Sequence, residues 1–139
     1  MRRAVVRRRD GYRHEVEMRQ HRLIVDEPEE KGGTDRGPMP AELLAASLAS
    51  CTAITMEMYA ARKEWGLGTV EVVVDFTEAK TDFPHEFDVQ ITLGAELSEE
   101  NRDRLLTIAG KCPVHKALKD QDVVIHDSLE FVEDVEDED

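Results

Sequence analysis

Hydrophobic and polar residues alternate along several short stretches of the chain, as expected for strands with one buried face. Residues 70–76 place valines and a phenylalanine on one face and acidic residues on the other, and residues 86–93 repeat the pattern. A short turn sequence separates the two stretches, so we expect an antiparallel hairpin. Residues 4–10, 13–19 and 21–27 predict three earlier strands.

The segment from Pro40 to Gly66 has helical spacing, with a proline suited to the first turn and a glycine suited to the end. Its apolar residues form one stripe, and further apolar residues extend that stripe over nearly all sides of the helix. We therefore expect the helix to be buried almost all round. A second apolar surface must then cover the side that the sheet leaves open. A homodimer would supply it, and so would a monomer whose own short helices fold over that side. The stripe contains Leu44, Leu48, Cys51, Thr55 and Met58.

Two shorter helices and a last strand complete the predicted order. Ser98 is suited to cap a helix over 98–111, and Pro113 is suited to start a short helix with Cys112 at its N-cap. Residues 123–132 alternate again and predict a strand. Because strands occur in groups, the expected fold class is α+β with antiparallel sheet.

The length of 139 residues fits one domain, spanning 1–139, and the net charge is −13. Five of the first nine residues are arginines, which favours a solvated strand face over an arm that binds nucleic acid, because such arms belong to basic chains. We expect no nucleic-acid or anionic-membrane partner. The acidic end, residues 133–139, is expected to be disordered.

No stretch approaches the ~18–20 apolar residues of a membrane span, and the start lacks the apolar core of a signal peptide. A cytoplasmic location is therefore expected. In that reducing compartment, two cysteines are expected to be free, catalytic or redox-cycling and not a permanent disulfide.

Cys51 admits two interpretations. It is either a small buried hydrophobic residue or a reactive thiol, and a reactive thiol needs a nearby cation to hold its thiolate. No basic residue lies one helical turn away. The candidates are Arg36, in the loop before the helix, or an arginine of the early strands: Arg13, Arg19 or Arg22.

Cys112 lies at a predicted helix N-terminus, which lowers the pKa of a thiol, and Lys111 precedes it. If both thiols face one cavity, they are a candidate peroxidatic and resolving pair. A zinc site from Cys112, His115 and Cys51 is an alternative, but no second paired motif accompanies "CPVH". We expect neither a metal nor a cofactor.

The stretch "PMPAELLAASLASC" and the later "IAGKCPVHKAL" together resemble the OsmC/Ohr family of osmotically inducible and organic hydroperoxide resistance proteins. The resemblance implies an α+β fold in which two chains intertwine, with active sites at the dimer interface. It also implies that Cys51 is the peroxidatic cysteine, that Cys112 is the resolving cysteine, and that a dithiol reductant reopens their disulfide.

The family's peroxidases activate the thiolate with an arginine and with a glutamate ten residues before the cysteine. This chain has Ala41 at that position and Glu42 one residue later. A regular helix turns Glu42 away from Cys51, so Glu42 either holds the N-terminal end of the helix or pairs with a loop arginine such as Arg36. Glu42 and Arg36 remain the catalytic candidates beside the cysteines.

Two functions compete. The first is a homodimeric, metal-free peroxidase that reduces organic hydroperoxides or hydrogen peroxide in oxidative stress defence. The second is a non-enzymatic stress protein that binds a small apolar or thiol-containing ligand in an interface cavity. The two cysteines favour the first function, and the missing glutamate favours the second. A redox sensor that signals through its disulfide is a third class, for which the sequence identifies no partner.

Overall fold

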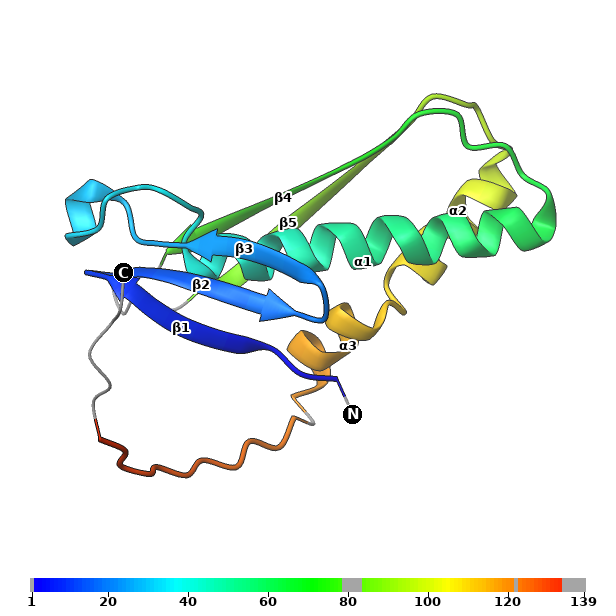
Figure 1. Ribbon diagram of the computed structural model, residues 1–139. Helices are drawn as coiled ribbons and strands as arrows, with labels where there is room; N and C mark the ends of the chain where they lie inside the picture. The colour runs from blue at the N-terminus through cyan, green and yellow to red at the C-terminus, as the bar shows by residue number, and fades with distance from the viewer. Residues whose placement is uncertain (1, 79–83, 122, 134–139) are drawn as a thin grey trace.

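The computed structural model describes residues 2–78, 84–121 and 123–133 (Figure 1). Strands and helices occur in groups, so the predicted α+β class is confirmed. In chain order the elements are β1 (Val5–Asp10), β2 (Arg13–Met18), β3 (His21–Val25), a short 3-10 turn η1 (Glu29–Lys31), α1 (Pro40–Lys63), β4 (Val70–Glu78), β5 (Pro84–Leu93), α2 (Glu99–Ala109) and α3 (Pro113–Asp120).

The strands form two antiparallel sheets, β1-β2-β3 and β4-β5. In the second sheet Val72 lies opposite Ile91, which places the apolar positions of both strands on one face. The predicted hairpin is therefore confirmed, although residues 79–83, where its turn was expected, lie outside the described part of the chain.

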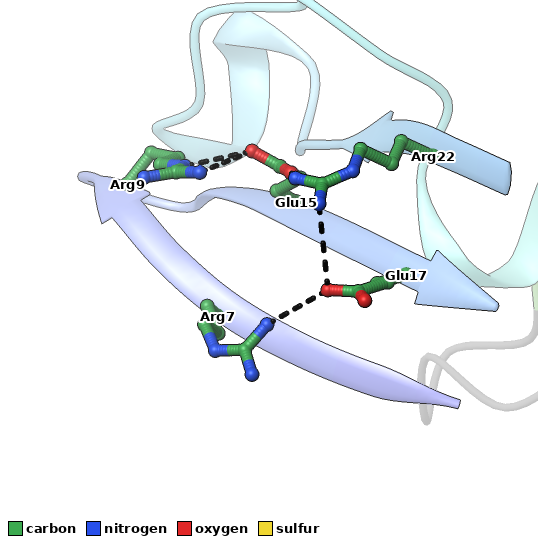
Figure 2. Close-up of polar contacts among 5 residues, drawn as sticks. All are labelled: Arg7, Arg9, Glu15, Glu17 and Arg22. Carbon is green, nitrogen blue, oxygen red and sulfur yellow. Dashed lines mark hydrogen bonds and ion pairs between the residues drawn. The ribbon is translucent and has the colours of Figure 1, made fainter. Parts of the chain in front are cut away.

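Ion pairs cover one face of the β1-β2-β3 sheet (Figure 2). Arg7 contacts Glu17 at 3.1 Å, and both Arg9 and Arg22 contact Glu15. The hydrogen bond from Arg9 and that from Arg22 lower the pKa of Glu15. These arginines are exposed, so the start of the chain is a solvated strand face, and such pairs add little stability.

The core lies along one side of α1, where the sheet β4-β5 and the two later helices pack against it. The buried positions on α1 are shifted by about one residue from the predicted stripe, because α2 and α3 cover that side. The core cluster consists of Met56, Ala60, Leu67, Leu105 and Ala109, with Tyr59 and Trp65 packed against it.

The expected burial of α1 almost all round is not reached within the single chain, and the second surface that a homodimer would supply stays a prediction. The side chains of Ile54 and Met58 are 50% and 58% exposed, because no element described here covers that side. The helix also ends earlier than expected, at Lys63, since Glu64 adopts the left-handed conformation and forms the C-cap.

The predicted last strand is also wrong for the single chain. Residues 123–133 have no regular secondary structure and run away from α3 (Figure 1). A strand needs a neighbour to pair its backbone groups, and here Leu129 and Phe131 are 81% and 92% exposed. The acidic end expected to be disordered falls, from residue 134 onward, outside the described residues.

By length and composition alone, α1 could cross a membrane, contrary to the expectation that no stretch approaches a span. The core helix of a soluble protein satisfies the same criteria. Several side chains of α1 are buried against other elements of the chain, which fits a core helix.

Candidate active site

Cys112 begins α3 with an unusual cap. Its backbone is extended, Pro113 occupies the first helical position, and its sulfur accepts a hydrogen bond from the backbone N–H of His115 at 3.3 Å. The predicted N-cap is therefore confirmed. The thiol takes the place of the usual hydroxyl or carboxylate, because its sulfur reaches one of the free amides of the first turn.

The middle of α1 places Cys51, the second thiol, close to Cys112. Thr52 is 2% exposed and its Oγ1 lies 3.8 Å from the Cys112 Sγ, within hydrogen-bonding range for sulfur. Its neighbour Cys51 is partly exposed and close enough to raise the pKa of Cys112. The structure thus brings together the two cysteines that lie 61 residues apart in the sequence.

Burial raises the pKa of the Cys112 thiol, and the neighbouring Cys51 raises it further. The His115 N–H and the Thr52 hydroxyl lower it, but they do not outweigh the cost of placing a thiolate in a fully buried position. The helix N-terminus lowers the pKa of this thiol as expected, but burial raises it by more, because the sulfur is shielded from water.

Glu42 lies in the first turn of α1, where its carboxylate accepts a hydrogen bond from the Met39 backbone N–H at 3.0 Å. Of the two alternatives left open by the sequence, holding the end of the helix is the one observed. Between Glu42 and Cys51 the helix rises by about 13 Å, so Glu42 lies far along the axis from the thiol.

Arg36 lies in the loop between η1 and α1, four residues before the helix begins at Pro40. Its side chain is exposed, and in the described residues its guanidinium forms no ion pair. Two of the other arginine candidates are engaged elsewhere, Arg13 with Asp10 and Arg22 with Glu15. In the described residues no hydrogen bond or ion pair joins Arg36 to Cys51.

Asp26 organises this loop and was missed from the sequence. Only 1% exposed, it accepts hydrogen bonds from the backbone N–H groups of Glu27 and Arg36 at 2.8 and 3.1 Å, and from the hydroxyl and N–H of Thr34. The Thr34 hydroxyl and these amides lower its pKa to about 2. The signal in the sequence that could have indicated this role is the glycine-rich stretch after Asp26, because glycines allow two stretches of backbone to lie close together.

Two glycines let the loop lie against the end of β3. A Cβ at Gly33 would overlap the Glu27 carbonyl oxygen, and one at Gly37 would overlap the Ile24 carbonyl oxygen. Any larger residue would push the loop off the strand.

An apolar hollow of about 430 Å³ lies between β5 and α2. Met56, Ile91, Leu93 and Leu105 line it, with Arg102 among the lining residues, and neither cysteine is part of it. As for the zinc alternative, the described residues contain no group of three or more His, Cys, Asp or Glu side chains that could hold a metal.

Solved structures with the same fold include proteins of stress and hydroperoxide resistance. A Psychrobacter arcticus 273-4 protein, provisionally named an osmotic stress induced and detoxification response protein, is 27% identical, with 82% of this chain and 85% of that chain covered and a TM-score of 0.72. An OsmC-like protein from Mycoplasma pneumoniae is 18% identical, with 86% and 87% covered and a TM-score of 0.70. The organic hydroperoxide resistance protein OhrB of Bacillus subtilis is 22% identical, with 86% and 90% covered and a TM-score of 0.54.

No curated protein shows significant sequence similarity to the chain. The family model for OsmC-like proteins, in contrast, matches residues 33–126. That range includes α1 with Cys51 and the start of α3 with Cys112, and it covers more than half of the chain. The chain therefore belongs to the OsmC-like protein family.

Proposed function

We propose that this protein is a thiol-dependent peroxidase that reduces organic hydroperoxides or hydrogen peroxide in the cytoplasm, in oxidative stress defence. The observation that carries the proposal is the meeting of a partly exposed Cys51 with a buried Cys112 at the contact between α1 and α3. An accessible thiol can meet a peroxide, and a shielded thiol beside it can close a disulfide. Family membership and the name of the Bacillus subtilis neighbour agree with this role.

In the first step, the Cys51 thiolate attacks the terminal oxygen of the hydroperoxide. An S–O bond forms, the O–O bond breaks, and the alkoxide or hydroxide leaves and takes a proton from solvent. In the second step, the Cys112 thiolate attacks the sulfur of the Cys51 sulfenic acid, so an S–S bond forms and hydroxide leaves as water. A dithiol reductant then reopens the disulfide by thiol exchange.

The proposed active form is a homodimer. Ile54 and Met58 leave an apolar strip exposed on α1, and residues 123–132 leave an alternating apolar segment without a neighbour. In the described residues the sheet β1-β2-β3 also makes no extensive packing with α1, α2 or α3. A second copy that covers these surfaces would bring its own loop arginine, Arg36, toward a thiol with which the same chain's Arg36 forms no hydrogen bond in the described residues.

The test mixes fully reduced protein with one equivalent of cumene hydroperoxide or hydrogen peroxide, follows thiol loss by stopped flow and maps the products by mass spectrometry. We expect loss much faster than for free cysteine, ending in a Cys51–Cys112 disulfide and abolished in Cys51→Ser. Cys112→Ser should stop at the sulfenic acid. A Cys51 that reacts no faster than free cysteine would refute the peroxidase.

The catalytic role of the other two candidates is tested in the same assay. Arg36→Gln should slow the first step about 10- to 100-fold if its guanidinium hydrogen-bonds the thiolate and the leaving oxygen. Glu42→Gln keeps a side chain able to cap α1, so a slower first step in this variant would assign the carboxylate a part in the chemistry.

The second candidate function, binding of a small apolar ligand, is favoured by the hollow between β5 and α2. Such a protein would take up an apolar probe while its cysteines react slowly. Leu105→Gln, which places a polar group in the lining of the hollow, should abolish that binding.

A further inference from the structure

Thr52 is a buried polar residue between the two thiols. It follows Cys51 directly on α1, and only 2% of its surface is exposed. A buried hydroxyl without a hydrogen-bond partner destabilises the fold, so the partner it has is informative. In the described residues that partner is the Sγ of Cys112, at 3.8 Å from Oγ1.

The same sulfur has a second polar contact, which comes from α3. The backbone N–H of His115 in α3 lies 3.3 Å from it. The sulfur, which is fully buried, is therefore contacted from both helices. Either Thr52 or the Cys112 thiol can be the donor in the contact with α1, but once Cys112 is a thiolate only the Thr52 hydroxyl can donate. Since adjacent helical residues differ by about 100° in direction, α1 can present Thr52 to the core while Cys51 lies nearer the surface.

We propose that Thr52 is a positioning residue for the resolving step, whose hydroxyl orients the Cys112 sulfur toward Cys51 and stabilises the thiolate that attacks the sulfenic acid. This inference rests on the proposed peroxidase function. The hydroxyl donates a hydrogen bond to the Cys112 thiolate and transfers no proton. The Cys112 proton passes to solvent, and the net step converts one sulfenic acid and one thiol into a disulfide and water.

The decisive variant is Thr52→Val, which keeps the branched shape and removes the donor. Thr52→Ser keeps a hydroxyl and should behave like wild type. Thr52→Ala also lacks the hydroxyl and replaces Thr52→Val if the valine variant fails to fold. Thr55→Val is the matched control, because Thr55 lies on the same helix and has no hydrogen bond to either cysteine in the described residues.

The first readout is the lifetime of the Cys51 sulfenic acid after a single peroxide addition, trapped with dimedone and quantified by mass spectrometry across a pH series. At neutral pH, Thr52→Val should resolve roughly 3- to 10-fold more slowly than wild type, while Cys51 oxidation keeps its rate. The difference should shrink at high pH, where Cys112 is a thiolate in both proteins and only the effect of orientation remains. A merely structural role would not produce this pH dependence.

The second readout needs no peroxide. In a Cys51→Ser background Cys112 is the only cysteine, so the difference in absorbance at 240 nm from the Cys51→Ser/Cys112→Ser variant, which cancels the two tyrosines, titrates it alone. Thr52→Val should raise the midpoint by about 0.4–1 pH unit, and Thr52→Ser and Thr55→Val should leave it in place.

The outcomes separate the two proposals. A wild-type protein that forms no sulfenic acid refutes the peroxidase and the positioning role with it. A wild-type protein that forms the disulfide, together with a Thr52→Val variant whose resolving rate and Cys112 midpoint match wild type, overturns the role of Thr52 alone.

Discussion

Asp26 determines how the loop before α1 folds, because backbone and side-chain donors of the loop converge on one buried carboxylate. The hydrogen bonds from these donors stabilise the carboxylate by more than the loss of its hydration destabilises it, because the pKa of Asp26 is depressed. The Asp26 side chain therefore anchors the loop that carries Arg36, beside backbone hydrogen bonds such as the one from the Asp35 N–H to the Glu27 carbonyl oxygen.

This carboxylate gives a pH-dependent prediction. Its pKa of about 2 in the folded state lies below the ordinary value of 3.8, so its contribution to stability is complete above about pH 4 and is lost as pH falls through about 2. Asp26→Asn should melt several degrees below wild type at pH 7, and the gap should shrink toward pH 2. Thermal unfolding followed by circular dichroism measures both.

Asp35, an exposed residue of the same loop, provides the control. The melting temperature of Asp35→Asn should be close to that of wild type. Equal melting temperatures for Asp26→Asn and wild type at pH 7 would show that the buried carboxylate does not hold the loop.

The residues predicted well from the sequence are those whose roles depend on near neighbours. Cys112 could be placed at an N-cap because Pro113 follows it, and Ser98 caps α2 through the Asn101 N–H three residues on. Thr52 and Asp26 were missed because their partners come from a distant helix or from a loop folded back on itself. Burial, which governs the pKa of Cys112, is likewise a tertiary property.

Among the elements, the loop between β3 and α1 places the strictest requirement on the sequence. Gly37 has no room for a Cβ, whereas a Cβ at Gly66 would meet nothing within 4 Å. Gly37→Ala should therefore destabilise the protein by about 1–3 kcal/mol, and Gly66→Ala should change stability by no more than about 0.5 kcal/mol. Urea unfolding monitored by circular dichroism compares the two, and equal midpoints would contradict the close approach.

The strands show where pattern reading succeeds and where it stops. The alternation at residues 70–76 and 86–93 gave a correct hairpin, because each strand is the other's nearest neighbour in the chain. The equally clear alternation at residues 123–132 gave no strand, because the described chain offers no edge paired with it. Periodicity indicates which face of a strand would be buried, but a strand forms only where a neighbouring strand can pair with its backbone.

At the scale of the whole molecule, the apolar strip on α1 leads to a prediction about assembly. Met58→Glu places a charge on a side chain that is exposed in the single chain, so the fold should be unaffected. In a homodimer the charge would be buried, and we expect the dimer dissociation constant to rise about tenfold or more. Sedimentation equilibrium over a concentration series measures it.

Glu57→Gln, an exposed substitution on the neighbouring position, is the control and should leave the dissociation constant unchanged. A wild-type chain that sediments as a monomer at all concentrations would refute the dimer, and with it the proposed contribution of Arg36 from a second copy.

The edge-to-face contact between Tyr59 and Trp65, with ring centroids 5.6 Å apart, gives the protein a built-in optical probe. Trp65 is the only tryptophan, and it packs on the core cluster just beyond Lys63, the last residue of α1, which lies about 18 Å along the helix axis from Cys51. Its emission therefore reports core packing and not thiol chemistry. A change in tryptophan fluorescence when peroxide is added would reveal that oxidation in the middle of α1 alters packing beyond its C-terminal end.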